Sequence, residues 1–444
     1  MIILTNATIV ELDPPKVERG IDIVIEGTTI KEVGKGIASK YKADKVIDLQ
    51  GDVVSTGIVC SHNHFYSGLA CGMGRTVSFP PAYNFNGVLQ GVWWRLDRAL
   101  DEESTYYSGL ICALEAIKSG CTSVVDHHAS PDYIKGSLDT LAKGFYETGL
   151  RGMLCYETTN RNGGVKEERE GVDENIAFAN ACDNVKKNDS ENYIVEANIG
   201  GHAPFTISEE GLGMMGDAIK QTGRGVHIHV AEDLYDVAYC HDKYRKNLLE
   251  RLDAHGILND KALIVHGLHL VDSDIELLNE RDSFLTFNSR SNMNNNVGYN
   301  NNLNKIKNLC MGTDGMGADM FEEFKFAFFR QGEANGPLWD NDFMKFLNNG
   351  NKILERSFGE KFGKIEAGYK ADLTITGYTP RTPMESENVG GHMIYGMSSK
   401  DVKTVIVNGK VVFEDRAFPF DVKPIYEKAA AAAQKMWDRM EKIK

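Results

Sequence analysis

Two histidines one residue apart, His62 and His64, follow an apolar run in the segment IVCSHNHFYSG (residues 58–68). Imidazole is a common protein ligand for zinc and for ferrous iron. Side chains two positions apart on a β-strand point to the same face, so the two rings would lie together if the run is a strand. The pair alone is a weak signal, because two surface histidines, or one buried histidine with a hydrogen-bond partner, would give the same pattern.

Further histidines and carboxylates stand at the ends of other apolar, strand-like segments. His229 ends GRGVHIH, and Glu232 follows it by three residues. His266 ends ALIVH, Asp314 follows LCMGT, and His202 follows IVEANIGG. A chance scatter of the 12 histidines would not favour strand ends so strongly. The pattern therefore predicts that these side chains meet in one cluster.

The residue types of this cluster indicate hydrolytic chemistry. The expected metal ligands are His62, His64, His229 and Asp314. Such a mixed nitrogen and oxygen site suits zinc or ferrous iron and leaves room for water. A bound divalent cation lowers the pKa of that water toward ~7 and makes hydroxide available. Asp314 can accept the proton of the water, Glu232 can carry a proton to a leaving group or ring nitrogen, and His266 can orient the water.

The elements that must position these residues alternate along the middle of the chain. Strands are expected at about 57–62, 122–127, 151–157, 193–199, 225–230, 262–266, 283–287 and 308–313. Helical patterns lie between them at 102–120, 137–149 and 209–223, and the last two end in glycine, as helix C-termini often do. This α/β alternation predicts a TIM-like (β/α)8 barrel, in which catalytic groups stand at the carboxyl ends of the strands. The Asn-rich residues 291–305 are expected to form a loop.

The two ends of the chain have a different texture, with short strand-like segments and glycine breaks. We expect residues 1–55 and 363–420 to combine into one small discontinuous β-sandwich domain beside a catalytic barrel over residues 56–362. Residues 421–444 are rich in helix formers, and they are expected to form a helix on the outside of the protein.

Composition limits the possible partners. The 444 residues are 42% hydrophobic and 25% charged, as in ordinary soluble proteins, and a net charge of −14 argues against a nucleic-acid partner. We find no signal-peptide pattern and no apolar run near the ~20 residues that span a membrane. The eight cysteines form no C-x-x-C pair, which favours a reducing cytoplasm. We expect a cytoplasmic homo-oligomer, a dimer, with a small-molecule substrate.

Several residues are candidates for substrate contacts. They are His202, His128, Trp93 and Arg290. His127 and His128 end the second strand, and one of them is expected to face the pocket, although plain packing would explain the pair equally well. Packing is also the common role of loop aromatics such as Trp93 and Trp94, and Arg290 could instead be a solvated loop residue. His227 is expected to face the outer layer of the barrel and not to bind the metal.

The ordered motifs resemble those of a known superfamily. The segments GIVCSHNHFYSG, HIHVAED, VHGLHL and MGTDGMG, with GKIEAGYKADLTI and VIVNGKVVFED, resemble the chlorohydrolase and aminohydrolase branch of the amidohydrolase superfamily. The resemblance covers essentially the whole chain. Residues 93–131 and 319–330 are similar to the aminohydrolases associated with selenium metabolism, which are linked to anaerobic purine breakdown.

The resemblance implies a role for each motif residue. The metal ligands would be His62, His64, His229 and Asp314. Glu232 would match the proton-shuttling glutamate, His266 the histidine that activates water, and His202 a substrate contact. Binuclear members carry a bridging carboxylated lysine around the fourth strand. NYIVEANIGGHAPF contains none, so one divalent ion per chain, zinc in preference to ferrous iron, is expected. NSRSN departs from the usual N-P-x-S-N after the seventh strand, which leaves the substrate contacts of that loop open.

The leading hypothesis is a metal-dependent aminohydrolase that acts on a purine-like nitrogen heterocycle, with Glu232 as proton shuttle, in anaerobic purine catabolism. Ring opening of a cyclic amide needs the same groups and remains an alternative. A barrel without catalysis, acting as a binding or selenium-related accessory subunit, is a further alternative, but all four expected ligands are present.

Overall fold

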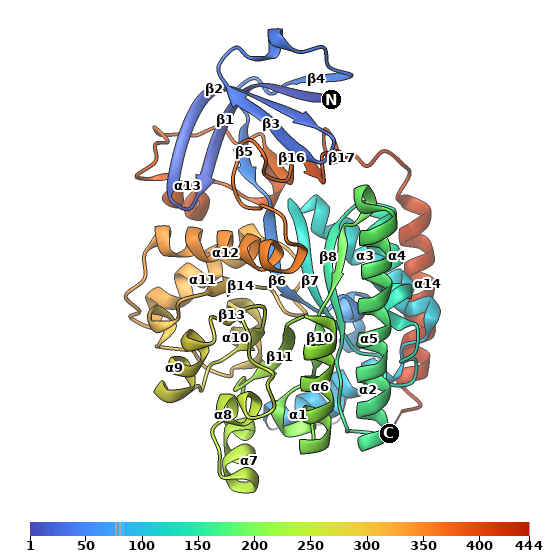
Figure 1. Cartoon of the computed structure of the whole chain (residues 1–444). Helices are drawn as coiled ribbons and strands as arrows, with labels where there is room; N and C mark the ends of the chain where they lie inside the picture. The colour runs from blue at the N-terminus through green and yellow to red at the C-terminus, as the bar shows by residue number, and fades with distance from the viewer. Residues whose placement is uncertain (76–77, 80–81, 83, 444) are drawn as a thin grey trace.

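Parallel strands form the centre of the molecule. The computed structural model describes residues 1–75, 78–79, 82 and 84–443 (Figure 1), and within them the parallel strands belong to a four-stranded and a five-stranded sheet. The first contains β6 (Ile58–Asn63), β7 (Cys121–His128), β8 (Arg151–Tyr156) and β9 (Val195–Ala197). The second contains β10 (Ile199–Gly201), β11 (Val226–Val230), β12 (Leu263–His266), β13 (Phe284–Phe287) and β14 (Leu309–Met311). Every residue of these strands is buried, as is usual for parallel sheets covered by helices.

The two parallel sheets contact each other at both edges. Thr158 forms a parallel bridge with Gly201 beyond the end of β8, and Asn63 forms one with Asp314 beyond the end of β14. The amide of Thr313 also donates to the carbonyl of His62 at 2.9 Å. The predicted strand at 193–199 is divided between β9 and β10, and the other predicted strands agree with the observed ones except at their ends.

Helices alternate with these strands, which confirms the α/β prediction. The longer ones are α3 (Glu102–Lys118), α4 (Ser137–Thr148), α5 (Val165–Asn188), α6 (Glu209–Thr222), α11 (Met320–Glu333) and α12 (Asp340–Phe358). The shorter ones are α1 (Phe85–Val88), α2 (Trp94–Arg98), α7 (Leu234–Tyr244), α8 (Leu248–Asp253), α9 (Asp272–Glu280) and α10 (Ser289–Asn295). Gly149 and Gly223 end α4 and α6 with φ of 77° and 68°, a left-handed conformation that glycine adopts easily.

Both ends of the chain contribute to a separate sheet, visible at the top of Figure 1. Its strands are β1 (Ile2–Leu12), β2 (Pro15–Glu26), β3 (Thr29–Gly34), β4 (Lys45–Asp48), β5 (Val53–Thr56), β15 (Leu373–Thr376), β16 (Val402–Val407) and β17 (Lys410–Phe413). All eight are hydrogen-bonded into one sheet, in the order β17-β16-β15-β5-β1-β2-β3, with β4 beside β1. The expected two-sheet sandwich is therefore replaced by a single sheet, because β1 is long enough to pair with both β4 and β5 along one edge.

A buried ion pair joins the separate sheet to the parallel strands. Arg151, the first residue of β8, donates to Asp372 just before β15, with Nε–Oδ2 and Nη2–Oδ1 distances of 2.6 and 3.1 Å. Both side chains are almost completely inaccessible to solvent. The helices α13 (Val389–Tyr395) and α14 (Lys423–Met440) complete the fold, and Met436 and Met440 of α14 pack with Leu96 of α2. No helix in the described part of the chain is long and apolar enough to cross a bilayer.

Candidate functional site

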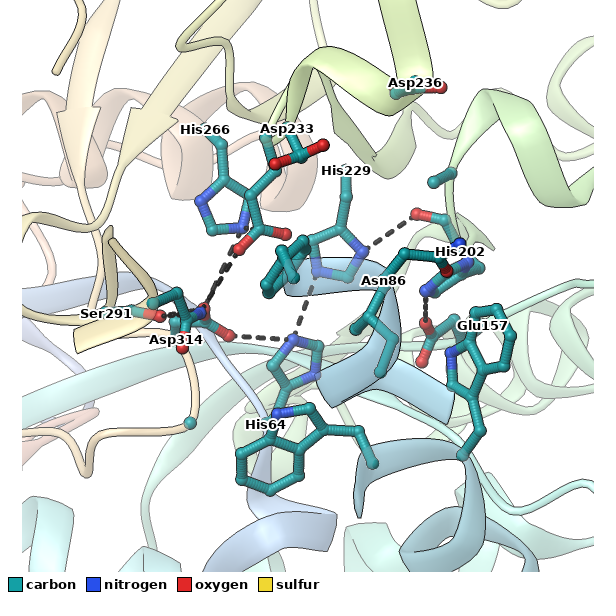
Figure 2. Close-up of a pocket in the computed structure, with 18 of the residues that line it drawn as sticks. His64, Asn86, Glu157, His202, His229, Asp233, Asp236, His266, Ser291 and Asp314 are labelled. Atoms are coloured by element: carbon teal, nitrogen blue, oxygen red, sulfur yellow. Dashed lines mark hydrogen bonds and ion pairs between the residues drawn. The ribbon is translucent and has the colours of Figure 1, made fainter. Parts of the chain in front are cut away.

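An open cleft of about 990 Å³ lies where the parallel strands end. Its polar lining contains most of the residues that the motifs predicted, and these are His64, His202, His229, Glu232, His266 and Asp314. Aromatic side chains also line the cleft, and these include Phe85, Trp93, Trp94, Phe205 and Tyr235. Figure 2 shows His64 and His229 between Asp314 and His266 on one side and His202 and Glu157 on the other. An apolar wall with a few convergent polar groups is typical of a small-molecule site.

Two histidines of the cleft face each other with their Nε2 atoms. The Nδ1 of His64 donates to the carbonyl oxygen of His127 at 2.7 Å, and the Nδ1 of His229 donates to that of His202 at 2.8 Å. In the neutral tautomers that these bonds select, each Nε2 carries a lone pair. The two Nε2 atoms are only 3.1 Å apart. Without a cation, Asp314 raises the pKa of His64 to about 9 despite the burial of the ring, so a proton on His64 Nε2 joins the two nitrogens. A divalent cation would replace that proton and be bound by both nitrogens.

His62 and Asp314 complete the donor set. The Oδ1 of Asp314 lies 3.1 Å from His64 Nε2 and 3.6 Å from His62 Nε2. Burial alone would raise the pKa of Asp314, but His62 and His64 hold it well below its usual range. The buried Nε2 of His62 has no hydrogen-bond partner among the described residues. Three imidazoles, one ionised carboxylate and an unpartnered buried nitrogen fit a divalent cation.

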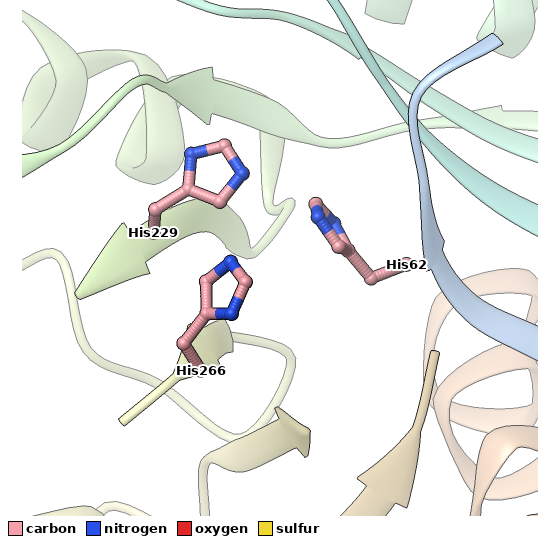
Figure 3. Close-up of side chains that lie close together, drawn as sticks. All are labelled: His62, His229 and His266. Carbon is pink, nitrogen blue, oxygen red and sulfur yellow. The ribbon is translucent and has the colours of Figure 1, made fainter. Parts of the chain in front are cut away.

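His62, His229 and His266 approach one another from β6, β11 and β12 (Figure 3). Their nearest ring nitrogens all lie within 4.8 Å of one another. His266 Nε2 is 3.5 Å from Glu232 Oε2 and 3.9 Å from Asp314 Oδ2. Burial, and then the charge of Asp314, raises the pKa of Glu232 well above its usual range. Glu232 can therefore hold a proton near neutral pH beside the expected ligands.

The backbone is strained where these groups are displayed. His266 and Asp314 have φ of 69° and 53°, and Ala231, just before Glu232, has φ of 52°. Residues other than glycine seldom adopt this left-handed conformation, and such strain is concentrated at functional sites. Here it turns the chain at the ends of β12, β14 and β11, so that each side chain enters the cleft.

The helix α10 was not predicted, and its polar residues hold the site. The Asn-rich segment, expected as a loop, begins inside this helix. Ser291 donates to Asp314 Oδ2 at 2.5 Å, Asn292 Oδ1 lies 2.9 Å from His266 Nδ1, and Asn295 donates to Glu232 Oε1 at 3.4 Å. These tertiary bonds satisfy side chains that otherwise compete with helical hydrogen bonds. The Asn-rich segment follows a predicted strand directly, and this position was the one sequence feature that indicated a role at the site.

The predicted orientation of His227 is wrong. It lies two positions from His229 on β11, so both side chains point to the same face, and His227 is completely buried. Its Nε2 is 2.8 Å from His62 Nδ1, and its Nδ1 is 3.6 Å from Cys155 Sγ. His227 therefore contacts a predicted metal ligand from inside the fold. His127 also points inward, and its Nε2 donates to the carbonyl groups of Gly201 and His227.

The four predicted substrate contacts are placed differently. His202 and Trp93 line the cleft. His128 is not among the residues that line it, and its Nε2 is hydrogen-bonded to Ser130 Oγ at 2.9 Å. Arg290 does not line it either, since its guanidinium group is bound to Glu322 and Glu323 of α11.

Glu157 is a residue that the motifs missed. It directly follows β8, lines the cleft, and has its Oε1 3.4 Å from His202 Nε2. Burial raises the pKa of Glu157 to about 7. Nearby, Arg161 binds Asp97 at 2.8 Å. No spacing rule marks an isolated acidic residue, and only its position after a predicted strand could have identified Glu157.

Comparisons with known proteins agree with this geometry. Residues 53–412 match the amidohydrolase family. The chain is 29% identical over 451 residues to a 5'-deoxyadenosine deaminase from Methanosarcina barkeri (strain Fusaro / DSM 804), with 99% of each chain covered. It is 31% identical over 402 residues to a 5-methylthioadenosine/S-adenosylhomocysteine deaminase from Thermococcus onnurineus (strain NA1), with 89% of this chain and 90% of that one covered.

A solved structure supports the fold. The structure of an adenosine deaminase from Xanthomonas campestris with bound zinc matches with a TM-score of 0.81 at 21% identity, and the match covers 100% of this chain and 99% of that one. The superfamily resemblance and the expectation of a hydrolase acting on carbon–nitrogen bonds are confirmed, whereas the similarity to the selenium-associated aminohydrolases is not confirmed. A family match over most of the chain and a cleft with the residues of its motifs lead to one conclusion: the chain belongs to the amidohydrolase family.

Proposed function

We propose that this protein is a metal-dependent aminohydrolase that removes an amino group from an adenine nucleoside or a related purine-like heterocycle. The observation that carries the proposal is the placement of Glu232 and His266 beside His64, His229 and Asp314 in one cleft. The relatives described above are named as deaminases of adenosine derivatives, which supports the same reaction.

The metal site is proposed to hold one zinc ion per chain. The ligands would be His62, His64, His229 and Asp314. Nitrogen-rich sites of this kind suit zinc, and the structure from Xanthomonas campestris has zinc bound. Residues 193–205 contain no lysine that could bridge a second ion. A divalent cation at this position would polarise water and lower its pKa toward neutrality.

The side chains around that position would manage the protons. The low pKa of Asp314 keeps its carboxylate ionised. Glu232, with its raised pKa, would deliver a proton to a ring nitrogen or to the departing amine without occupying a coordination position. His266, held by Asn292, would orient the attacked carbon and the incoming water. Burial lowers the pKa of His266, so its imidazole is neutral in this role.

The fold would support this chemistry by bringing the ends of the strands together around one cleft. We infer from the bridges at both edges that the two parallel sheets close into a single barrel. The aromatic side chains that line the cleft, Trp93 and Phe205 among them, offer flat surfaces for a heterocycle.

The test is to load purified protein with zinc and to incubate it with adenosine, 5'-deoxyadenosine, adenine and guanine. We expect ammonia release together with the ultraviolet change of deamination for at least one of them. An ultraviolet change without ammonia would favour ring opening. The absence of both signals from a broad purine panel would overturn the proposal.

A further inference from the structure

Glu157 lies in the cleft but belongs neither to the proposed metal ligands nor to the proton-transfer pair. Its amide donates to the carbonyl of His128 at 2.7 Å, which continues the backbone hydrogen bonding beyond β7 and β8. The residue is only 3% exposed. Figure 2 shows it next to His202, across His64 and His229 from Asp314. Its role must therefore concern the part of a substrate that lies away from the reacting carbon.

His202 presents an acceptor to Glu157. The hydroxyl of Thr206 donates to the carbonyl of Ala203 at 3.0 Å, so its oxygen accepts from His202 Nδ1 at 2.7 Å. The Nε2 of this tautomer carries a lone pair and lies 3.4 Å from Glu157 Oε1. Burial raises the pKa of Glu157 to about 7, and above this pH its ionised carboxylate and His202 Nε2 are two acceptors that face the same region of the cleft.

The second carboxyl oxygen also lacks a donor. Glu157 Oε2 has no hydrogen-bond partner in the described part of the chain, and His127 Nδ1 lies 4.0 Å away. His127 uses its Nε2 hydrogen for the carbonyls of Gly201 and His227, so its Nδ1 is an acceptor as well. Buried acceptors are normally satisfied, so the carboxylate group as a whole lacks donors, and a ligand that reaches its Oε1 from the cleft would offset part of this deficit.

Charge restricts what that ligand can be. Arg161 is the single lysine or arginine among the described residues that line the cleft. It donates to Asp97 at 2.8 Å and to Thr159 at 3.1 Å, and it lies over the ring of Trp94. Its charge is therefore already paired. A phosphate or carboxylate beside Glu157 would have no free cation to balance it.

We propose that Glu157 is a specificity-determining residue, which together with His202 binds an uncharged substrate edge carrying two neighbouring N–H or O–H donors. The inference rests on the proposed function, because it assigns the substrate class of that same cleft. Two parts of a nucleoside offer such an edge. One is the vicinal diol of the ribose, and the other is an N–H edge of the base. Anionic nucleotides are excluded in either case.

The experiment compares zinc-loaded wild type with Glu157→Gln, which keeps the shape of the side chain but removes one acceptor. Glu210→Gln is the matched control, since that carboxylate is exposed on α6 and pairs with Arg169. The ligands are adenosine, 2',3'-dideoxyadenosine, adenine and adenosine 5'-monophosphate. Steady-state kinetics gives kcat and KM, calorimetry gives Kd, and metal analysis gives the zinc content.

We expect Glu157→Gln to retain zinc and to raise KM and Kd for the preferred ligand about 10- to 100-fold, with a smaller effect on kcat. Wild type should prefer adenosine to its monophosphate by at least about tenfold. If the diol is the bound edge, 2',3'-dideoxyadenosine should bind wild type more weakly than adenosine does. The Glu157→Gln substitution should then not weaken the binding of 2',3'-dideoxyadenosine any further. If the base is bound, adenine itself should become sensitive to the substitution.

Several results would overturn the inference. These are an unchanged KM and Kd in Glu157→Gln, a loss of zinc from it, and equal binding of adenosine and its monophosphate by wild type. The proposed function fails separately. If no ammonia is released but nucleosides bind and Glu157→Gln weakens the binding, the reaction is wrong and the specificity residue stands. If wild type and variant release ammonia equally well, the proposed reaction stands and the role of Glu157 is wrong. If no nucleoside binds, both proposals are wrong.

Discussion

His227 Nε2 lies 2.8 Å from His62 Nδ1, on the side of the His62 ring away from Asp314. For His62 to bind a metal through Nε2, its Nδ1 must carry the proton and donate it to His227. The second nitrogen of His227 then carries a proton of its own and faces Cys155 Sγ at 3.6 Å. A chain of three buried side chains thereby selects the tautomer of one proposed ligand.

We therefore expect His227→Phe to weaken zinc binding about 10- to 100-fold, because the acceptor for His62 is lost. Competition with a chromophoric chelator measures this affinity. His227→Gln, which keeps an acceptor oxygen, should recover part of it. Wild-type zinc affinity in the phenylalanine variant would mean that His227 only fills space.

The proposed ligands should be individually necessary for metal retention. His62→Asn and His229→Asn should each lower the zinc content well below the one ion per chain expected for wild type, because each removes one of few ligands. Metal analysis of purified protein measures this directly. His241→Asn, on the exposed surface of α7, is the control. Full retention in both ligand variants, or two ions in wild type, would contradict the assignment.

Glu232→Gln should separate proton transfer from metal binding. The variant keeps the size of the side chain but cannot exchange a proton, so turnover should fall by ~10²–10⁴ while zinc content stays at the wild-type level. Single-turnover kinetics on a substrate of the wild type provides the measurement. Asp242→Asn, an exposed carboxylate on α7, controls for the loss of one charge. Unchanged turnover would make Glu232 a structural residue.

Asp236 predicts a pH dependence of stability. Burial raises its pKa from 3.8 to about 7, although its Oδ2 accepts from the amide of Ala231 at 2.9 Å. A carboxyl group with a raised pKa in the folded state binds more protons there than in the unfolded chain, so stability falls as pH rises from about 4 to about 7. Asp236→Asn removes this loss in the free energy of unfolding, which can reach ~4 kcal/mol for such a pKa shift.

Thermal unfolding of wild type and Asp236→Asn at pH 5, 6, 7 and 8 tests this sign. The melting temperature of the variant should rise relative to wild type as the pH increases up to about 7, and the difference should then level off. A difference that is constant over this range, or that shrinks with rising pH, would show that Asp236 ionises normally in the folded protein.

The Arg151–Asp372 pair should be important for stability. Replacing Asp372 by asparagine leaves a buried guanidinium group without its counter-charge, and we expect a loss of ~3–5 kcal/mol in the free energy of unfolding. Asp253→Asn breaks a pair of similar length with Arg281, but that arginine is 44% exposed, so the loss should stay below ~1 kcal/mol. Equal losses in urea titrations of the two variants would refute this ranking.

The sequence predicted the position of the cleft because its signals are local. An apolar strand followed by a histidine or acidic residue can be read directly from the chain. The predicted end of the strand carrying His266 agrees with the structure, and those near His62 and Asp314 differ by one and two residues. The same reading failed for His227, where the two-residue repeat was applied correctly to His62 and His64 but not to β11. The spacing of His227 and His229 was the same as that of His62 and His64, so it already indicated that both side chains of β11 face the same way.

Other residues could not be placed because their partners are distant in the sequence. Arg290 turns away from the cleft because Glu322 and Glu323 of α11 bind it, and no local pattern reveals that pairing. Asn292 and Asn295 lie in α10, and their side chains are bound by His266 and Glu232, which are distant in the sequence. Glu157 gains its significance only from the acceptors around it, which come from His127 on β7 and from His202 after β10.

The single sheet built from both ends of the chain also bears on how the protein is made. Thr56 of β5 pairs with Leu373 of β15, whereas its other neighbour, β1, lies close in sequence. During synthesis β1 and β5 can therefore pair early, but one edge of β5 stays open until all of the described parallel strands have emerged from the ribosome. An open edge can pair with another chain, so a nascent protein would gain from a chaperone that covers β5 until β15 arrives.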